Sequence, residues 1–248
     1  MIIDEIKAVL EKNGHDINSD VISRIETMVA SIRDDNQINK LDYIIDWFNK
    51  KREESDMVVE EIGINDLDKW NVDPDTGNIK HESGGFFEVI GVKALNTFDR
   101  EVGKKGWTQP MIAKNPGGIL GIIMKRINGV PHYLLQAKAE PGNIGKLQLS
   151  PTLQATTSNL LKAHGGSKPL FAEYFDEENN PEIIYAKWQS EDGGRFHLKS
   201  NYNMIVEVKE EELEIPDSFI WVTLYQIKQL MKIENFVGPH VRGIISYL

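Results

Sequence analysis

Apolar side chains recur at helical spacing through the first fifty residues of the chain. Ile3, Ile6, Val9 and Leu10 fall on one face of a first helix, because residues three and four apart share a helix face. A second helix follows the start signal at residues 18–20, and a third is predicted over residues 41–49. We therefore expect an N-terminal helical segment over residues 1–56.

Beyond residue 57 the pattern changes to short apolar runs separated by Gly, Pro, Asn and Asp, which is typical of β-strands. The hairpin signal Asn128-Gly129 joins two of these runs. Helices are expected over residues 151–164 and 223–233. The predicted strands are 85–92, 118–126, 131–138, 182–189, 195–199 and 203–208. The pattern predicts an α+β domain over residues 57–248 with a mixed or antiparallel sheet, because the strand spacing does not suit a doubly wound parallel sheet.

Composition narrows the class of protein. The chain has 248 residues, of which 40% are hydrophobic and 27% charged, as in a globular protein. No apolar run is long enough to cross a membrane, and the first residues lack the basic start and apolar run of a signal peptide. The absence of cysteine excludes disulfides, thiolate zinc sites and a cysteine nucleophile. We expect a cytoplasmic protein with no membrane partner.

The formal net charge is −10, which argues against a nucleic-acid partner because such proteins present a basic face. The single basic run, residues 50–52, is followed at once by Glu53 and Glu54, so we interpret it as a solvated helix end. A small anionic ligand stays compatible with this charge, since a pocket needs only a few cations and backbone N–H groups.

The most informative segment follows the strand that ends at Lys138. A Pro141-Gly142 turn comes next, and Ser150 with Pro151 has the form of an N-cap and first helical residue. Free N–H groups and the helix dipole there would favour a diphosphate; a plain capped helix is the other interpretation. The predicted helix contains no Asp or Glu, so it offers hydrogen-bonding groups for a sugar or a pyrimidine rather than carboxylates for Mg²⁺. A buried helix with incidental Thr and Ser is the alternative.

Two further segments carry candidate chemistry. The Gly193-Gly194 turn precedes Arg195, which is able to bind a phosphate or carboxylate in bidentate fashion or to form a plain surface ion pair. His81 lies among polar residues before a strand, although a lone histidine is more often structural. Trp107 is able to stack on a base, although buried aromatics are more often core residues.

In this order, the segments resemble the NDP-hexose 2,3-dehydratase family of deoxysugar biosynthesis. The matching stretches are Trp70 with TGNIKHESGGFF, then GWTQP, GGILGI, HYLLQAKAEPGN, LQLSPTLQATTSN, QSEDGGRF and FIWVTLYQIKQL. The resemblance implies a fold related to Nudix hydrolases, a mixed β-sheet flanked by helices, without their acidic metal-binding helix. Two departures from the family pattern are Tyr202, where Arg is common, and the run from Val237 to His240.

The resemblance also implies how the chain assembles and what it needs. Family members usually carry two copies of this domain in a chain nearly twice as long, so a homodimer would restore the pair. The implied substrate is a nucleotide-diphosphate sugar, of the dTDP-4-keto-6-deoxyglucose type. A base removes the C3 proton, which the C4 ketone acidifies, the C2 hydroxyl leaves as water, and the enol becomes a 3,4-diketo-2,6-dideoxy sugar. No cofactor is expected, because electrons move only within the substrate.

The candidate catalytic residues are Glu140 and His81, as base and acid in either order, with Lys138 polarising the C4 oxygen. Lys138 has two other possible roles, pairing with Glu140 or binding phosphate. No metal site is expected. The expected substrate-binding residues are Ser83, Arg100, Trp107, Gln136, Gln148, Ser150, Gln154, Ser158, Asn159, His164, Gln189, Ser190, Glu191, Arg195, Asn201 and Asn203.

Two other functions compete with a dehydratase. One is a catalytically inactive nucleotide-sugar-binding module of the same fold. The other is a metal-dependent nucleoside-diphosphate hydrolase, which the absence of acids from residues 151–164 disfavours.

Overall fold

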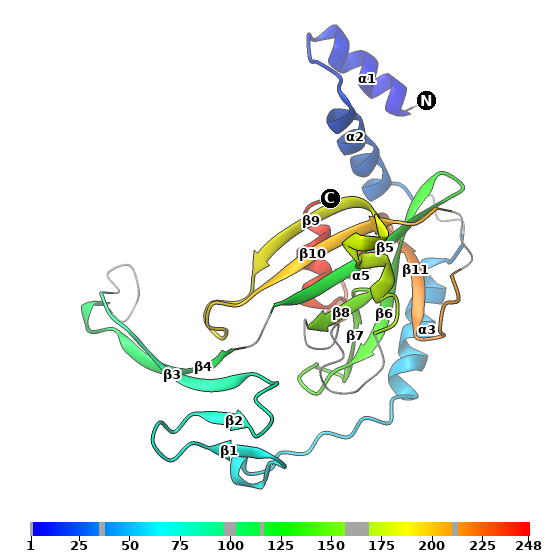
Figure 1. Cartoon of the computed structure of the whole chain (residues 1–248). Coiled ribbons are helices and arrows are strands. Elements are labelled where there is room, and N and C mark those ends of the chain that lie inside the picture. The colour runs from blue at the N-terminus through cyan, green and yellow to red at the C-terminus, as the bar shows by residue number, and fades with distance from the viewer. Residues whose placement is uncertain (1, 35–37, 97–102, 115–116, 157–168, 210–212) are drawn as a thin grey trace.

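A seven-stranded mixed sheet forms the centre of the molecule (Figure 1). The computed structural model describes residues 2–34, 38–96, 103–114, 117–156, 169–209 and 213–248. The strand order is β11-β6-β5-β10-β9, with β7 paired to β6 and β8 paired to β5. The strands are β5 (Gly118–Ile127), β6 (Val130–Ala139), β7 (Leu147–Ser150), β8 (Leu153–Thr156), β9 (Glu182–Ser190), β10 (Ser200–Glu207) and β11 (Phe219–Thr223). The pair β10–β5 is parallel and the other pairs are antiparallel, which confirms the predicted α+β class and mixed sheet.

The sheet divides into two arms next to Thr152. Strands β5 and β6 pair only between Ile123–Leu134 and their hairpin end; beyond that point β6 pairs with β7, and β5 pairs with β8. The Thr152 hydroxyl lies where the arms part. It accepts a hydrogen bond from the Ile123 N–H at 2.9 Å and donates one to the Leu134 carbonyl. We call this division of the sheet the fork.

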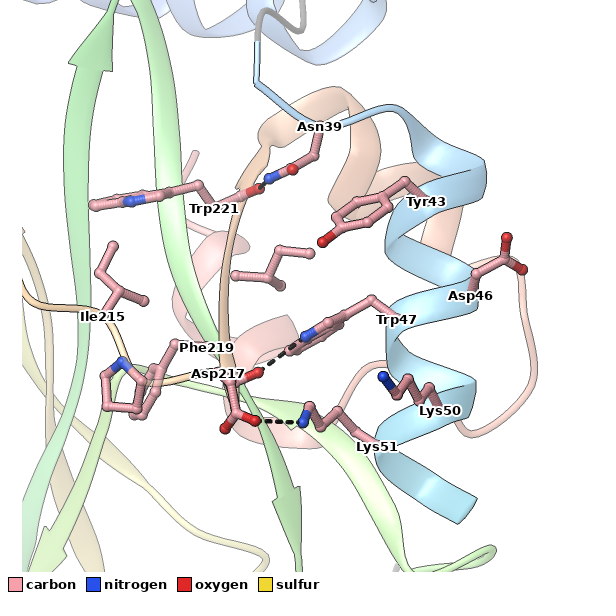
Figure 2. A pocket seen from close by; sticks show the side chains of 12 residues that line it. Asn39, Tyr43, Asp46, Trp47, Lys50, Lys51, Ile215, Asp217, Phe219 and Trp221 are labelled. Carbon is pink, nitrogen blue, oxygen red and sulfur yellow. Dashed lines mark hydrogen bonds and ion pairs between the residues drawn. The ribbon is translucent and has the colours of Figure 1, made fainter. Parts of the chain in front are cut away.

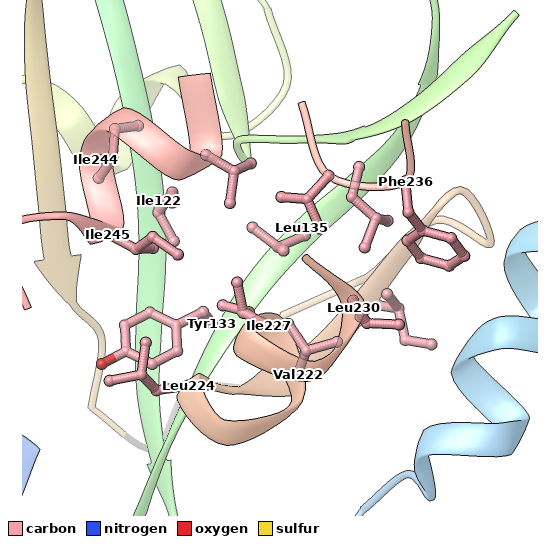
Figure 3. Packing of buried hydrophobic residues seen from close by; sticks show 14 of the residues in the cluster. Ile122, Tyr133, Leu135, Val222, Leu224, Ile227, Leu230, Phe236, Ile244 and Ile245 are labelled. Carbon is pink, nitrogen blue, oxygen red and sulfur yellow. The ribbon is translucent and has the colours of Figure 1, made fainter. Parts of the chain in front are cut away.

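Apolar side chains cover both faces of the sheet, as the nearly continuous apolar run of β5 requires. On one face, α5 (Leu224–Leu230) and α6 (Pro239–Ile245) pack on the strands (Figure 3). Ile122, Leu135, Ile227 and Ile244 there are fully buried. The other face is covered by a second cluster that includes Phe171 and Phe175. The short 3-10 helices are η1 (Ile64–Asp66), η2 (Gly103–Lys105), η3 (Ala172–Phe175) and η4 (Glu177–Asn179).

The predicted N-terminal helices are present as α1 (Ile2–Lys12), α2 (Ser19–Ile32) and α3 (Leu41–Glu53). The first two project from the body of the molecule (Figure 1), whereas α3 packs on the core through Ile44 and Phe48, both fully buried. The division at residues 56 and 57 stays a prediction, but α3 contributes to the core of the domain that follows it.

Helix α3 lies along β11, an edge strand of the sheet (Figure 2). Trp47 Nε1 donates to the Asp217 carbonyl at 3.0 Å, and Lys51 Nζ forms an ion pair with the Asp217 carboxylate at 2.7 Å. Asn39 Nδ2 donates to the Trp221 carbonyl at 3.1 Å. These side chains satisfy main-chain groups beside and within the edge strand, where another strand would otherwise pair.

A second, four-stranded antiparallel sheet lies apart from the main one (Figure 1). It consists of β1 (Trp70–Val72), β2 (Ile79–His81), β3 (Glu88–Ala94) and β4 (Trp107–Ala113), paired in that order. The small sheet contacts the β9–β10 loop, where the Ile112 N–H donates to the Arg195 carbonyl at 2.9 Å and the His197 N–H donates to the Ile112 carbonyl at 2.8 Å.

Two of the predicted elements are wrong. The helix expected from Pro151 is absent over its described part, residues 151–156, because Leu153 and Ala155 point into the core by strand alternation while Gln154 and Thr156 alternate with them. Its remainder, residues 157–164, lies outside the described residues. The strand expected over residues 195–199 is a loop with one bridge at Phe196; Leu198 has φ 53°, which a strand does not accommodate. Over the described ranges, no helix is both long and apolar enough to cross a membrane.

Candidate functional site

Three polar side chains meet where the arms of the fork diverge. Lys138 Nζ lies 3.1 Å from Glu140 Oε1, and Gln154 Nε2 donates to the same oxygen at 3.0 Å. The first two come from the end of β6 and the third from β8, so the contact joins the two arms. Strand alternation predicted that Gln136, Lys138 and Glu140 would lie together, and Gln136 and Lys138 do line one cavity with Gln154.

Glu140 lines a second cavity, so its contacts with Lys138 and Gln154 connect residues of the two cavities. The wall of the second cavity includes Gln148 and Ser150 of β7, the segment from Gly238 to His240, and Arg242. The Gly238 N–H donates to the Leu149 carbonyl and the Leu149 N–H donates to the Phe236 carbonyl, each at 2.8 Å. These bonds fix the start of α6 along the free edge of β7.

Ser150 does not begin a helix, so the anion site predicted at a helix N-terminus is wrong. Ser150 is the last residue of β7 and pairs with Gln136 of β6. It is buried, with 5% of its surface exposed, and it still lines the second cavity with Gln148. The helix dipole that the sequence suggested therefore does not act there.

A buried polar row crosses the other arm. Gln154 and Asn203 both pair with Leu120, on β8 and β10, and directly paired residues share one face of a sheet. In the described part of the chain, Gln154 Oε1 and Asn203 Oδ1 are buried acceptors without a partner. Asn203 is 5% exposed. Unsatisfied buried acceptors are costly, so both oxygens are suited to receive hydrogen bonds from a ligand's hydroxyl groups.

The ends of β9 and β10 extend this row. Asn203 Nδ2 donates to Gln189 Oε1 at 2.6 Å, and Asn201 Nδ2 donates to the Glu191 carboxylate. The Asn201 side chain also accepts the Gly118 N–H at 3.2 Å. Ser190, which ends β9, is exposed. The predicted binding residues here form two hydrogen-bonded pairs, Asn203 with Gln189 and Asn201 with Glu191, and Asn201 lies opposite Gln189 in the strand register.

His240 is a site residue that the sequence analysis did not select. It lies in the first turn of α6 and lines the cavity that contains Glu140. Burial lowers the pKa of His240 below 6.5; Glu191 and Glu140 raise it in opposition, and Lys138 and Lys199 lower it further. Burial likewise lowers the pKa of Lys199, against the attraction of Glu191.

Arg242 and Thr152 were also missed. Arg242 is an exposed cation on the wall of the second cavity. A sequence signal for this region exists: Pro239 at a first helical position, followed by Val241, Ile244 and Ile245 at helical spacing. That pattern predicts α6 and places His240 and Arg242 on its first two turns. Thr152 carries no comparable signal, because its role depends on two strands that only the fold brings together.

The predicted residues His81, Ser83, Trp107 and Arg195 lie elsewhere. His81 Nδ1 is 2.8 Å from Ser83 Oγ, and its ring packs edge-on against Trp70, in a sheet that lies apart from β6 and β7 (Figure 1). Trp107 Nε1 donates to Gln109 Oε1, and Gln109 Nε2 donates to the Gly194 carbonyl, each at 2.7 Å. This chain of bonds connects Trp107 to the exposed loop of Arg195, so these residues form a separate group.

Other predicted residues, Arg100, Ser158, Asn159 and His164, lie outside the described residues. Across the described ranges, no group of three or more His, Asp or Glu side chains has the arrangement of a metal site.

Comparison with known proteins identifies the family. The family model described as NDP-hexose 2,3-dehydratase matches residues 41–248. Two similar proteins are each named dTDP-4-dehydro-6-deoxy-alpha-D-glucopyranose 2,3-dehydratase. The protein from Amycolatopsis orientalis is 37% identical, and the match covers 100% of this chain and 51% of the relative's length. The protein from Saccharopolyspora spinosa is 40% identical, and the match covers 81% of this chain and 40% of the relative's length. A crystal structure of a Nudix hydrolase from M. smegmatis is similar at 13% identity with a TM-score of 0.32, over 58% of this chain and 93% of its own. The chain spans about half the length of the curated relatives it matches. The residues of the fork thus lie within the matched region, and the chain belongs to the NDP-hexose 2,3-dehydratase family.

Proposed function

We propose that this chain removes water from the 2,3 positions of a nucleotide-diphosphate 4-keto-6-deoxyhexose, of the dTDP-4-keto-6-deoxyglucose type. The observation that carries the proposal is the cluster at the fork, where the Lys138–Glu140 pair lies beside the unpartnered oxygen of Gln154. A cation and a carboxylate next to free acceptors are what an elimination on a hydroxylated sugar needs. The family membership supports the same reaction.

The chemistry follows from the substrate. The C4 ketone acidifies the C3 proton, and removal of that proton places charge on the C4 oxygen. The C2 hydroxyl then leaves as water, and the enol product becomes a 3,4-diketo sugar. All electron movement is internal to the substrate, so the proposed reaction uses no redox cofactor.

The polar residues around the fork and in the second cavity each have a proposed role in this reaction. Lys138 stabilises the developing charge on the C4 oxygen, and Glu140 orients Lys138. Gln154 and Asn203 accept hydrogen bonds from sugar hydroxyls through their free oxygens. Gln148, Ser150 and Arg242 bind the diphosphate from the adjoining cavity. The roles of His81 as acid or base, and of Arg195 as a diphosphate ligand, stay predictions.

The test is the reaction itself, with purified chain and dTDP-4-keto-6-deoxyglucose. We expect the sugar to lose one water molecule, and mass spectrometry of the sugar measures this loss. Glu140→Gln and Lys138→Met should each lower kcat by about a hundredfold or more, while the affinity for dTDP changes little. The matched control is the exposed ion pair of Lys209 and Glu182, 2.6 Å apart: Lys209→Met and Glu182→Gln should leave kcat unchanged. Near-normal kcat in both fork variants would refute these roles.

The alternative is a nucleotide-sugar-binding module without activity. The same mixture separates the cases, because a binding module retains the nucleotide sugar unchanged. Release of a nucleoside monophosphate would instead identify a hydrolase and contradict both.

We also propose that the chain works as a homodimer in the cytoplasm, with the nucleotide sugar as its partner and no nucleic acid. Exposed apolar side chains on the projecting helices support pairing: Val9 is 59% and Ile32 64% exposed. Such side chains mark surfaces that associate.

A further inference from the structure

The geometry points to His240 as the group that takes the C3 proton of the sugar and returns it to the departing C2 hydroxyl. This role rests on the proposed function and adds to it a catalytic residue outside the Lys138–Glu140 pair.

The position of His240 is set by backbone contacts. The segment before it is bonded to both main-chain groups of Leu149 on β7, and Val241, fully buried, anchors the first turn of α6 in the core. His240 consequently lies on the wall of the cavity that it shares with Glu140, Gln148 and Ser150. Glu140 in turn contacts Lys138 and Gln154, so the cavity of His240 adjoins the residues to which the sugar is assigned.

Glu140 is less suited to carry the proton. Its Oε1 already binds both Lys138 Nζ and Gln154 Nε2. The ring nitrogens of His240, in contrast, form no hydrogen bond with any residue of the described ranges. His240 is therefore free to accept a proton from a ligand, whereas Glu140 serves to position Lys138.

The charges around His240 favour its neutral form. Burial and the cations Lys138 and Lys199 lower the pKa of the ring, and the carboxylates of Glu191 and Glu140 only partly oppose them. Arg242, on the same helix, adds a further positive charge at the cavity wall. A neutral imidazole at pH 7 is a competent base, and the imidazolium it forms is a competent acid.

One histidine is sufficient for both proton transfers of the elimination. The C3–H bond breaks, its proton goes to a ring nitrogen, and its electron pair forms the enolate whose C4 oxygen faces Lys138. The enolate then expels the C2 oxygen, the C2–O bond breaks, and the imidazolium transfers the proton to that oxygen. Water leaves, a C2–C3 double bond remains, and the ring is neutral again.

The test compares His240→Gln with wild type. We expect kcat to fall about a hundredfold or more with unchanged dTDP affinity. In the wild type, kcat should decrease towards acidic pH with a midpoint below the ordinary pKa of a histidine, because protonation removes the base, and His240→Gln should lack this decrease. The control, His15→Gln, changes an exposed histidine between α1 and α2 and should match wild type in both measurements.

Two outcomes overturn the inference in distinguishable ways. If wild type releases water but His240→Gln retains both kcat and the acidic limb, only the role of His240 is wrong. If the wild-type chain dehydrates no NDP-4-keto sugar, the proposed function is wrong and this role with it. Because His240 is part of α6, circular dichroism checks the fold of the variant and His240→Asn accompanies it; recovery of kcat in a folded His240→Asn protein also counts against the role.

Discussion

At the scale of single residues, one hydroxyl group separates the arms of the sheet. The Thr152 hydroxyl takes the place of a direct hydrogen bond between the strands, because it accepts from the Ile123 N–H and donates to the Leu134 carbonyl. Ile123 and Leu134 are both fully buried. Neither main-chain group has water as an alternative partner. The cavity between β6 and β8, and with it the place of Lys138, depends on this bridge.

Replacing Thr152 by valine should therefore destabilise the protein. Valine has nearly the same shape but leaves one buried N–H and one buried carbonyl without a partner, at about 1–3 kcal/mol for each group. We expect the free energy of unfolding in urea to fall by about 2–4 kcal/mol. Thr108→Val, at an exposed position of β4, is the matched control. Equal midpoints for the two variants would show that the bridge is dispensable.

Residue patterns predicted part of the site. Alternation along one strand was enough to associate Gln136, Lys138 and Glu140, because they are close in sequence. The charged groups that act on His240 lie at the end of β6 and in the β9–β10 loop, far from it in the sequence. No local pattern shows that these residues come together, and the polar residues around His81 indicate a candidate site at that histidine instead.

At the scale of elements, the strands β5, β6, β9 and β10 and the helices α1, α2, α3 and α5 followed from periodicity. The segment LQAT is wrongly predicted as helix, and LQLS is not predicted as a strand, although each alternates strictly between apolar and polar residues. The Ser150-Pro151 pair resembles a helix start, and a short apolar segment fits either period. The two segments form strands because LQLS pairs with β6 and LQAT pairs with β5. Pairing between distant parts of the chain cannot be read from either segment alone.

Helix α3 provides a prediction at this scale. Phe48 is fully buried and its ring lies 4.1 Å from that of Phe236, so Phe48→Ala should cost about 3–5 kcal/mol of unfolding free energy by leaving a cavity. Tyr43→Ala, on the same helix at a side chain that is 56% exposed, should change it by less than about 0.5 kcal/mol. Thermal unfolding of both variants measures the difference. A small loss for Phe48→Ala would mean that α3 is only loosely attached to the core.

At the scale of the whole molecule, the main sheet carries two appendages. The α1–α2 pair and the small sheet each extend from the body (Figure 1). On α1, none of the described residues is buried, although its apolar face is that of a packed helix. We propose that this apolar face packs on the second copy of the chain in the proposed homodimer.

Light scattering should give a mass of twice the 28.2 kDa of one chain. Ile32→Glu, which places a charge on the exposed apolar face of α2, should shift the mass towards that of one chain, because burying an unpaired charge is costly. Lys12→Glu, at an exposed polar position of α1, should leave the mass unchanged. A single-chain mass for the wild type at working concentration would contradict the homodimer.

The side chains that α3 directs at β11 have a further consequence. An unpaired edge strand offers its main-chain groups to any other strand, and this is how many sheets begin to aggregate. Trp47 donates a hydrogen bond to the Asp217 carbonyl, and Asn39 donates one to the Trp221 carbonyl. Lys51 adds a positive charge beside them through its ion pair with Asp217. The helix thus covers part of an edge at which another chain would otherwise be able to pair, in addition to contributing to the core.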